Sequence, residues 1–528
     1  MRIPKKKELL RLQTKYRTDK KIGEALGGVP AHLVAYWRKK KRIPACDLPK
    51  YGLKQIKALW ETWGSDKQAA AQLAITPAAF YKWRQKYRIK EKPRILRFNQ
   101  LQLNLFAESK PARSNYYQSL VEKIASLKLE QKGAMAGEKY RLEPNLVVLN
   151  SEWEKLIQAC ESLGVKRVKR VERVWAVLPA PGPSRDGSSE LLQNIKGFLK
   201  QYQIKNQFSS REGDSLQVLW ERSLVPPLGL AVGPDRSIQA AGFIGCWGQN
   251  LDPSDLAQFL EEGKFNLEVP ATLQIQLQGE ISPAIFASDI YSFLRRQIEP
   301  GLLQDKMIEL CGPALSQLSL SQRMALALLW TQAPIRGVLL EVDQLVRKNI
   351  LSRLKRSIPL TSGDEQAVYL EKLEFDLTLL EPQVSFLPPV NKVVPIRQQK
   401  KKPVHQIILG AGFHGRLEEL EVAARILSGR KIHPEVQLFI VPSSRAIFLS
   451  ALKKGYIRAL LEAGAIICDP GMANWENQLA SSGPILTTGR LNSNHSDIFQ
   501  PQEIIFANPA TAAASALKGE ITDPRDYL

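Results

Sequence analysis

From about residue 140 onward, the sequence alternates short β-branched apolar runs with helical stretches. Leu146–Leu149 and Val174–Leu178 are two of the apolar runs, and residues 187–202 form a helical stretch. Such an alternation is typical of α/β layers built on parallel sheets. At 528 residues the chain is also too long for one hydrophobic core, so we expect roughly two to four domains.

Positive charge is concentrated at the beginning of the chain. The net charge is +22, and residues 1–100 hold 26 Lys and Arg but only 7 Asp and Glu, a net charge of +19. The rest of the chain is therefore almost neutral. A basic segment on a near-neutral body predicts a polyanion-binding module fused to a second part. A solvated, lysine-rich surface is the alternative that the charge alone leaves open.

A pattern typical of a helix-turn-helix occurs twice in this basic segment. In residues 18–27, Thr18 can cap a short helix that ends at a glycine pair, and Pro30 then opens a second helix that runs into residues 38–42. Residues 65–74 repeat the first helix 47 positions later, and residues 75–88 repeat the second. We predict an all-α region with helix-turn-helix modules over 1–46 and 47–90, followed by a linker over 91–115.

The second helix of such a pair can lie in the major groove of DNA. Most basic side chains there would contact phosphates, and only a few could contact base edges. Small helical protein-docking modules are the alternative, but the repetition and the charge favour DNA as the partner. The candidate DNA-binding residues are the polar side chains of the two second helices: His32, Tyr36, Arg38, Lys39, Lys40, Arg42, Tyr81, Lys82, Arg84, Gln85, Lys86 and Arg88.

The C-terminal two thirds of the chain carry motifs in a recognisable order. Residues 407–420 are similar to I-G-S-C-T-N-G-R-x-E-D-L, and residues 507–516 with 521–524 are similar to A-S-P-A-x-A-A-A-S-A and I-T-D-P. Further matches include residues 217–219 and 232–235, 269–279, 380–384, 391–395, 429–431 and 441–444. Over about 400 residues the chain thus resembles the aconitase superfamily, and within it the 3-isopropylmalate dehydratase large subunit.

This resemblance implies three α/β/α domains around a cleft, with domains 1 and 2 over residues 116–400 and domain 3 over 401–528. It also implies a hydro-lyase with a [4Fe–4S] cluster held by three cysteine thiolates. The ligand positions fall on Gly412, Met472 and Trp475. None of these side chains supplies a thiolate, so we expect no cluster and no other cofactor.

The acid/base residues that the resemblance implies are also changed. Asp235 remains as a remnant, but the family's histidines fall on Ser237 and Leu216, and a cleft glutamate aligns with Thr331. Arg416 and Arg490 are retained and are candidates for binding a carboxylate, because an arginine fork pairs with carboxylate oxygens. Asp235 as a simple turn cap and Arg490 as an ion-paired surface residue are the structural alternatives.

These observations predict a catalytically inactive aconitase-like protein that binds DNA through its helix-turn-helix repeats. Such a protein would regulate transcription, and its body would sense a small organic acid or mediate assembly. A hydro-lyase with an altered or missing iron–sulfur site and an RNA-binding aconitase-like protein are the alternatives. Five widely spaced cysteines, no metal-ligand spacing and no apolar segment of membrane length favour a cytoplasmic protein without metal or membrane contact.

Overall fold

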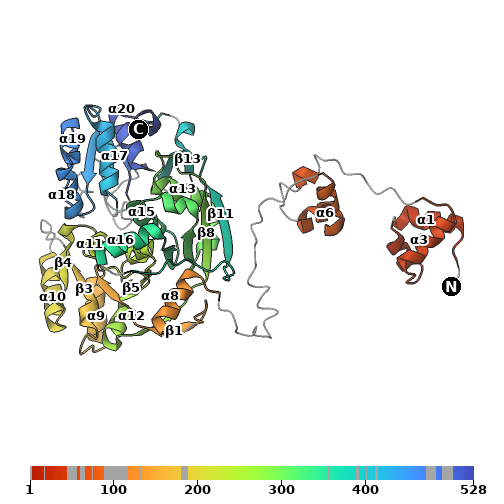
Figure 1. Cartoon of the computed structure of the whole chain (residues 1–528), viewed down its shortest axis with the longest axis horizontal. Coiled ribbons are helices and arrows are strands. Elements are labelled where there is room, and N and C mark those ends of the chain that lie inside the picture. Colours follow the sequence, from red (N-terminus) through yellow and green to blue (C-terminus); the bar gives the residue numbers. More distant parts are fainter. Residues whose placement is uncertain are drawn as a thin grey trace. The chain divides into compact units, whose positions relative to one another are not determined.

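A computed structural model of the chain divides into two compact units, Met1–Arg94 and Ile95–Leu528, which we call the head and the body. The positions of these parts relative to one another are not determined (Figure 1). The structure describes residues 3–16, 18–44, 56–59, 66–73, 75–87, 117–130, 133–179, 188–354, 357–387, 392–399, 401–410, 414–470, 483–489 and 503–528.

The two helix pairs expected in the head are present. The first pair is α2 (Asp19–Ala25) and α3 (Ala31–Lys40), and the second is α5 (Asp66–Gln72) and α6 (Pro77–Lys86). The Thr18 hydroxyl accepts a hydrogen bond from the Lys21 amide and caps α2, and Thr76 caps α6 in the same way at Ala79. Residues 91–115, the expected linker, lie outside the described residues.

The repeat begins earlier than the sequence pattern indicated. Helix α1 (Lys6–Tyr16) packs on α2 and places Leu9 in the core of the first module. The residue 47 positions later, Ile56, lies in a short helical segment and is equally buried in the core of the second module. Each module therefore includes helical residues that precede its helix-turn-helix pair.

The body begins with α8 (Leu120–Leu129) and an antiparallel pair of strands, β1 (Lys139–Leu142) and β7 (Phe265–Glu268). Its first large sheet is wholly parallel, in the order β4-β3-β2-β5-β6. The strands are β2 (Leu146–Leu149), β3 (Val174–Leu178), β4 (Gln207–Ser209), β5 (Leu230–Gly233) and β6 (Trp247–Asn250). The accompanying helices are α9 (Trp153–Ser162), α10 (Ser188–Gln201), α11 (Ser215–Glu221) and α12 (Pro253–Glu262).

The second sheet is also parallel, in the order β10-β9-β8-β11. The 3₁₀ helix η3 (Arg236–Ile244) packs between this sheet and the first one, against β6 and β10. A Cβ atom at Gly242 would lie 1.6 Å from the Val338 carbonyl oxygen, so only glycine permits this close approach. The strands are β8 (Thr272–Gln278), β9 (Met307–Cys311), β10 (Gly337–Leu340) and β11 (Glu371–Asp376), and the helices are α13 (Ala287–Gln297), α14 (Pro300–Leu303), α15 (Leu320–Trp330) and α16 (Gln344–Leu354).

The third sheet has the order β13-β12-β18-β17-β14-β15-β16. The predicted domain boundary at residue 400 is wrong, because β12 and β13 precede it and β12 pairs antiparallel with β18. The strands are β12 (Gln383–Leu387), β13 (Lys392–Pro395), β14 (Gln406–Gly410), β15 (Gln437–Val441), β16 (Ile466–Ile467), β17 (Ile485–Thr487) and β18 (Ile504–Ala507). The helices are α17 (Leu417–Leu427), α18 (Arg445–Lys453), α19 (Tyr456–Ala463) and α20 (Pro509–Lys518).

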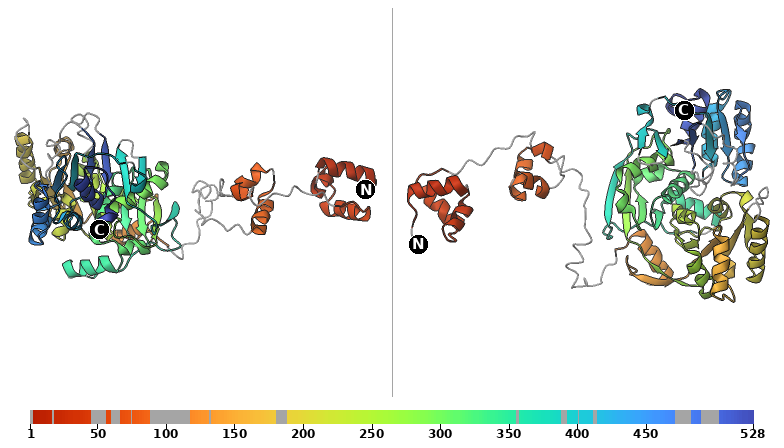
Figure 2. Two further views of the ribbon diagram at one scale, coloured as in Figure 1. Left: turned by 90° about the horizontal axis from the view of Figure 1, so that it is seen from above. Right: turned by 180° about the vertical axis from the view of Figure 1, so that it is seen from behind.

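The predicted α/β class is therefore confirmed. Helices cover the sheets of the body, and the third sheet with α17 to α20 lies above the first in Figure 1, with α18 next to β4 and α11 (Figures 1 and 2). The body has three large hydrophobic cores among its described residues. One lies between the first sheet and its helices, one lies between the third sheet and its helices, and one joins the first sheet to the second. In the described part of the chain, we find no helix with the length and apolar character that crossing a membrane requires.

Candidate functional site

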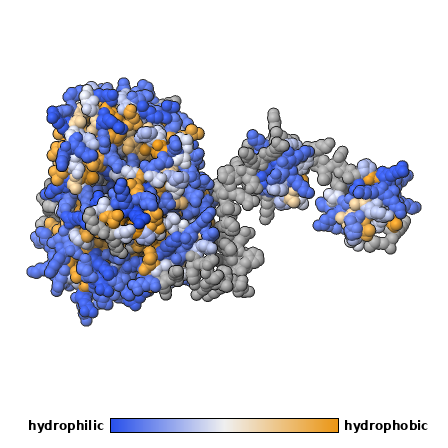
Figure 3. All heavy atoms as spheres, in the orientation of Figure 1, coloured by the Kyte–Doolittle hydropathy of each residue, from blue (hydrophilic) through white to orange (hydrophobic). Residues whose placement is uncertain are grey.

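Most of the candidate DNA-binding side chains are exposed on one face of each second helix. On the face drawn in Figure 3, the described surface of the two modules is mostly hydrophilic. Arg88 lies outside the described residues. The exposed candidates are His32, Tyr36, Lys39, Lys40 and Arg42 in the first module and Tyr81, Lys82, Gln85 and Lys86 in the second.

Arg38 and Arg84 do not belong to this exposed face, and their prediction as DNA contacts is corrected. Arg38 is 9% exposed and Arg84 is 2% exposed. The Arg38 guanidinium donates through Nε and Nη2 to the two Asp19 carboxylate oxygens at 3.0 and 2.9 Å. Arg84 pairs with Asp66 in the same geometry, at 3.0 Å for both bonds. Arg38 thus holds α3 to α2, and Arg84 holds α6 to α5.

The electrostatics of the first pair agree with this structural role. The hydrogen bond to Asp19 raises the pKa of Arg38, and this effect exceeds the opposing effect of burial. Bidentate pairing also fixes the orientation of the guanidinium plane. The rotation of α3 about its axis is therefore set by a buried contact, which leaves the opposite face of the helix to the solvent.

Four of the family-based positions in the body, namely Gly412, Met472, Trp475 and Arg490, lie outside the described residues. Their residue types still decide whether a [4Fe–4S] cluster fits. Iron–sulfur clusters are held by thiolate ligands, and none of the three positions that the resemblance assigned to ligands carries a cysteine. Among the described residues, no group of three His, Cys, Asp or Glu side chains could hold a metal ion. The donor set does not fit the cluster.

Asp235 performs the turn-capping role that was its structural alternative. It stands before η3, and its Oδ1 accepts a 2.7 Å hydrogen bond from the Ser237 amide. All three substituted positions are buried: Leu216 and Thr331 are each 1% exposed and Ser237 is 4% exposed. The Thr331 hydroxyl donates to the Leu328 carbonyl oxygen at 2.7 Å. The described hydrogen bonds of Asp235 and Thr331 are thus ones that stabilise local backbone structure.

Arg416 lies at the junction of the first and third sheets. It precedes α17 and is 2% exposed. Its Nη1 donates to the Gln217 Oε1 atom of α11 at 2.6 Å and lies 2.9 Å from the Met324 sulfur. Its Nε and Nη2 atoms are buried and have no hydrogen-bond partner among the described residues. The site thus contains a cation with two unused donors.

Carboxylates surround this cation. Burial lowers the pKa of Arg416, and the negative charges of Glu419, Asp214, Glu418 and Glu221 oppose that effect. The Glu419 carboxylate accepts hydrogen bonds from the Gly415 and Arg416 amides. The guanidinium is therefore largely neutralised by the protein itself, which weakens its attraction for an additional anion.

The same junction is held by direct contacts that the sequence motifs did not indicate. The Asp214 amide donates to the Ser443 carbonyl oxygen at 2.9 Å, and the Ser444 hydroxyl donates to Glu221 at 2.5 Å. Gly213 has a φ of +137°, and a Cβ atom there would lie 2.4 Å from the Ser443 carbonyl oxygen. The sequence signal that could have indicated a residue of this junction is Asp214, because an aspartate before an apolar helical pattern often caps the helix.

We expect Asp214→Asn to stabilise the body more at pH 8 than at pH 5. Burial raises the pKa of Asp214 to about 7, whereas an unfolded aspartate has a pKa of about 4. The folded state therefore binds more protons between these values, and the wild-type aspartate lowers stability as the pH rises through this window. Asparagine can still cap α11 but carries no charge.

The gain in unfolding free energy should be about 1–3 kcal/mol larger at pH 8 than at pH 5. Thermal or urea unfolding of the full chain at the two pH values measures it. An equal effect at both values would contradict the raised pKa.

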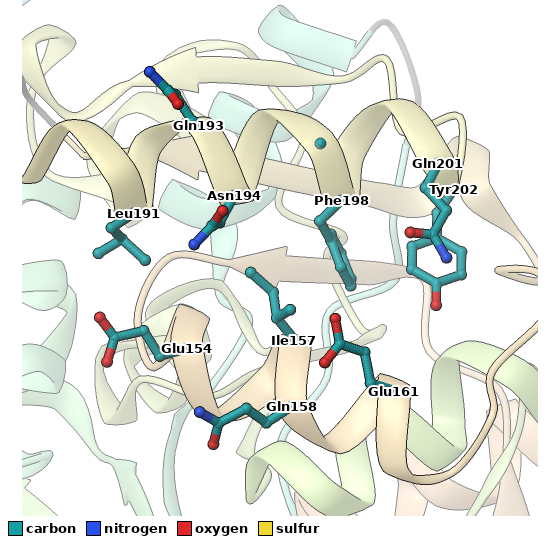
Figure 4. Close-up of a pocket in the computed structure, with 11 residues that line it drawn as sticks. Glu154, Ile157, Gln158, Glu161, Leu191, Gln193, Asn194, Phe198, Gln201 and Tyr202 are labelled. Atoms are coloured by element: carbon teal, nitrogen blue, oxygen red, sulfur yellow. The ribbon is translucent and has the colours of Figure 1, made fainter. Parts of the chain in front are cut away.

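A groove of about 470 Å³ lies elsewhere in the body, between α9 and α10 (Figure 4). Glu154, Glu161, Asn194 and Tyr202 are among its lining residues, and no lining residue is Lys, Arg or His. The groove is therefore unsuited to an organic acid, and it includes none of the predicted site residues.

Comparisons with known proteins agree with the motifs of the body. The model of the aconitase family (aconitate hydratase) matches residues 184–519. The chain is 30% identical over 379 residues to "3-isopropylmalate dehydratase large subunit 1" of Methanopyrus kandleri, covering 70% of this chain and 90% of that protein. The Pyrococcus abyssi protein of the same name is 31% identical over 424 residues, covering 78% and 99%.

Among solved structures, the crystal structure of Thermococcus kodakaraensis aconitase X in its holo-form matches with a TM-score of 0.41 and 14% identity. This match covers 70% of this chain and 89% of that one. The matched family model begins at residue 184 and so includes neither helix-turn-helix module. Through its body, the chain belongs to the aconitase family.

Proposed function

We propose that the chain binds duplex DNA through its head and acts as a transcriptional regulator in the cytoplasm. The observation that carries this proposal is the exposed face of α3 and α6. Lys39, Lys40, Lys82 and Lys86 are exposed there, while the ion pairs of Arg38 and Arg84 hold the two helices in place. Basic side chains on a rigid helix can neutralise phosphates and position the helix in a groove.

We further propose that the body does not carry out the family's dehydration chemistry. Departure of a hydroxyl group in such a reaction is assisted by a Lewis-acidic metal with an open coordination position. Gly412, Met472 and Trp475 cannot bind iron as thiolates do. The capping role of Asp235 supports the same proposal.

For the body we propose binding of a small organic acid at Arg416. The two unused donors, Nε and Nη2, support this assignment, because a guanidinium can bind a carboxylate with two parallel hydrogen bonds. The surrounding carboxylates oppose it, because their charges already compensate part of the guanidinium charge. Isopropylmalate and citrate are the probes, and a rise in the unfolding temperature that Arg416→Lys abolishes is the expected result.

A second candidate function is that of a hydro-lyase with an altered site. The names of the relatives in Methanopyrus kandleri and Pyrococcus abyssi favour this alternative. It requires measurable dehydration of isopropylmalate or citrate by the purified chain. The first proposal requires that neither reaction occurs.

The deciding experiment is a fluorescence anisotropy titration of the full chain with labelled duplex DNA at several salt concentrations. We expect binding that weakens steeply as salt increases, because neutralised phosphates release counterions. Absence of binding at low salt would overturn the DNA-binding proposal. The same preparation, assayed for dehydration, tests the alternative.

We also expect the chain to contain no iron–sulfur cluster after anaerobic purification. The reason is the loss of thiolates at all three ligand positions. Iron and acid-labile sulfide analysis of the full chain measures this directly. A stoichiometric content of both, lost on alkylation of Cys468, would show that other thiolates have replaced the original ligands.

A further inference from the structure

We propose that the two modules of the head contact different base sequences, so that one chain recognises a non-palindromic, two-part duplex DNA site. This inference rests on the DNA-binding function proposed above and adds the architecture of the target. It follows from comparing the same exposed positions on the two second helices.

The two helices can be aligned residue by residue because a buried contact fixes each of them. Arg38 and Arg84 are 46 positions apart, and each pairs with the aspartate that begins the first helix of its module. Val34 and Phe80, also 46 positions apart, are both fully buried. The two helices therefore turn the same positions toward their cores and the same positions toward the solvent.

The exposed positions that correspond in this alignment carry different chemistry. Tyr36 corresponds to Lys82, and Lys39 corresponds to Gln85. All four side chains are exposed. The positions of Lys40 and Lys86 carry lysine in both modules and are exposed in both. The common lysine suits a phosphate contact made by each module, whereas the differing positions suit contacts with bases.

The differing side chains prefer different bases. A glutamine amide can donate and accept hydrogen bonds at once, which matches the N6 and N7 atoms of adenine in the major groove. A lysine ammonium group only donates, which matches the O6 and N7 acceptors of guanine. At the base pair that this helix position contacts in each half-site, the first module should therefore prefer guanine through Lys39, and the second module should prefer adenine through Gln85.

Because two unlike modules are linked in one chain, the DNA site that they bind need not be two-fold symmetric. Dimers of identical helix-turn-helix subunits bind two-fold symmetric sites because both subunits present the same residues. Here both half-sites are bound by one chain, and the linkage raises the effective concentration of the second module once the first has bound. An asymmetric site is the consequence.

Selection of the full chain on a pool of random-sequence duplex DNA tests the inference. We expect enrichment of two unlike half-sites at a preferred spacing. Enrichment of one inverted repeat, or salt-dependent binding without any sequence preference, would overturn the inference and leave the DNA-binding function intact. Absence of salt-dependent binding would overturn the proposed function itself.

An exchange of residues tests the assignment of bases. The double variant Lys39→Gln with Gln85→Lys keeps the net charge and should exchange the guanine and adenine preferences between the half-sites. The ratio of affinities for the two bases at each step should change by about 5- to 150-fold, as expected for one good pair of hydrogen bonds. The control Lys7→Gln changes an exposed lysine of α1 and should leave both preferences unchanged. Unchanged preferences in the double variant would refute the assignment.

Discussion

Replacing Lys39, Lys40, Lys82 and Lys86 together by glutamine is expected to lower the affinity for duplex DNA about a thousandfold at 0.1 M salt. All four side chains are exposed on the second helices of the two modules. Each phosphate that a lysine neutralises contributes about 0.9 to the slope of log affinity against log salt concentration. Lys40 and Lys86 are the two lysines assigned to phosphates, so the slope should fall by about 2. The loss of the base contacts assigned to Lys39 and Lys82 should persist near 1 M salt.

Titrations by fluorescence anisotropy between 0.05 and about 0.5 M salt would measure both quantities. The matched control replaces four exposed lysines near or on α1, namely Lys5, Lys6, Lys7 and Lys15, by glutamine. This control removes the same charge, so general electrostatic attraction falls equally in both variants. If both variants lose the same affinity and slope, the binding surface is not the one formed by α3 and α6.

The layered α/β class of the body was predictable, but one domain boundary was not. Alternating apolar runs and helices indicate parallel strands, and they gave no sign of where an antiparallel strand would be added. β12 pairs with β18, whose residues lie more than a hundred positions later in the chain. A pairing over such a distance depends on the assembled third sheet and leaves no local pattern.

The two buried arginines of the head show why part of the site was mispredicted. In the sequence, Arg38 belongs to a run of basic residues and looks like its neighbours Lys39 and Lys40. What distinguishes it is the carboxylate of Asp19, which is distant in sequence but lies on the packed neighbouring helix. The sequence did contain a signal for this ion pair. The aspartate and the arginine both recur in the second module, as Asp66 and Arg84.

The contacts at the junction of the first and third sheets were beyond sequence reasoning for a related reason. The family motifs predicted Arg416 as a candidate carboxylate-binding residue but did not indicate which residues surround it. Its actual neighbours, Gln217 and Asp214, come from α11 and its cap, about two hundred residues earlier. The motifs therefore identified the arginine as a candidate, whereas the carboxylates that surround it could be found only from the fold.

Asp66→Ala is expected to unfold the second module of the head while leaving the first module folded. The Arg84 side chain is 2% exposed and depends on Asp66 for two hydrogen bonds. Removing Asp66, whose side chain is 24% exposed, takes the bidentate partner from a buried guanidinium and costs about 2–3 kcal/mol. The second module has a small core, made by Ile56, Ala69, Ala70 and Phe80, so this loss approaches the whole stability of such a unit.

Hydrogen exchange of backbone amides in the full chain separates this effect from general destabilisation. Protection should be lost in α5 and α6 and retained in α2 and α3, and Asp19→Ala should produce the converse pattern. The double variant Asp66→Ala with Arg84→Met removes both charges and keeps most of the buried volume, so protection in α6 should return. Retained protection in Asp66→Ala alone would mean that water solvates Arg84 and that the ion pair does not fix the helix. The residue-by-residue alignment of the two DNA-facing surfaces would then lose its main support.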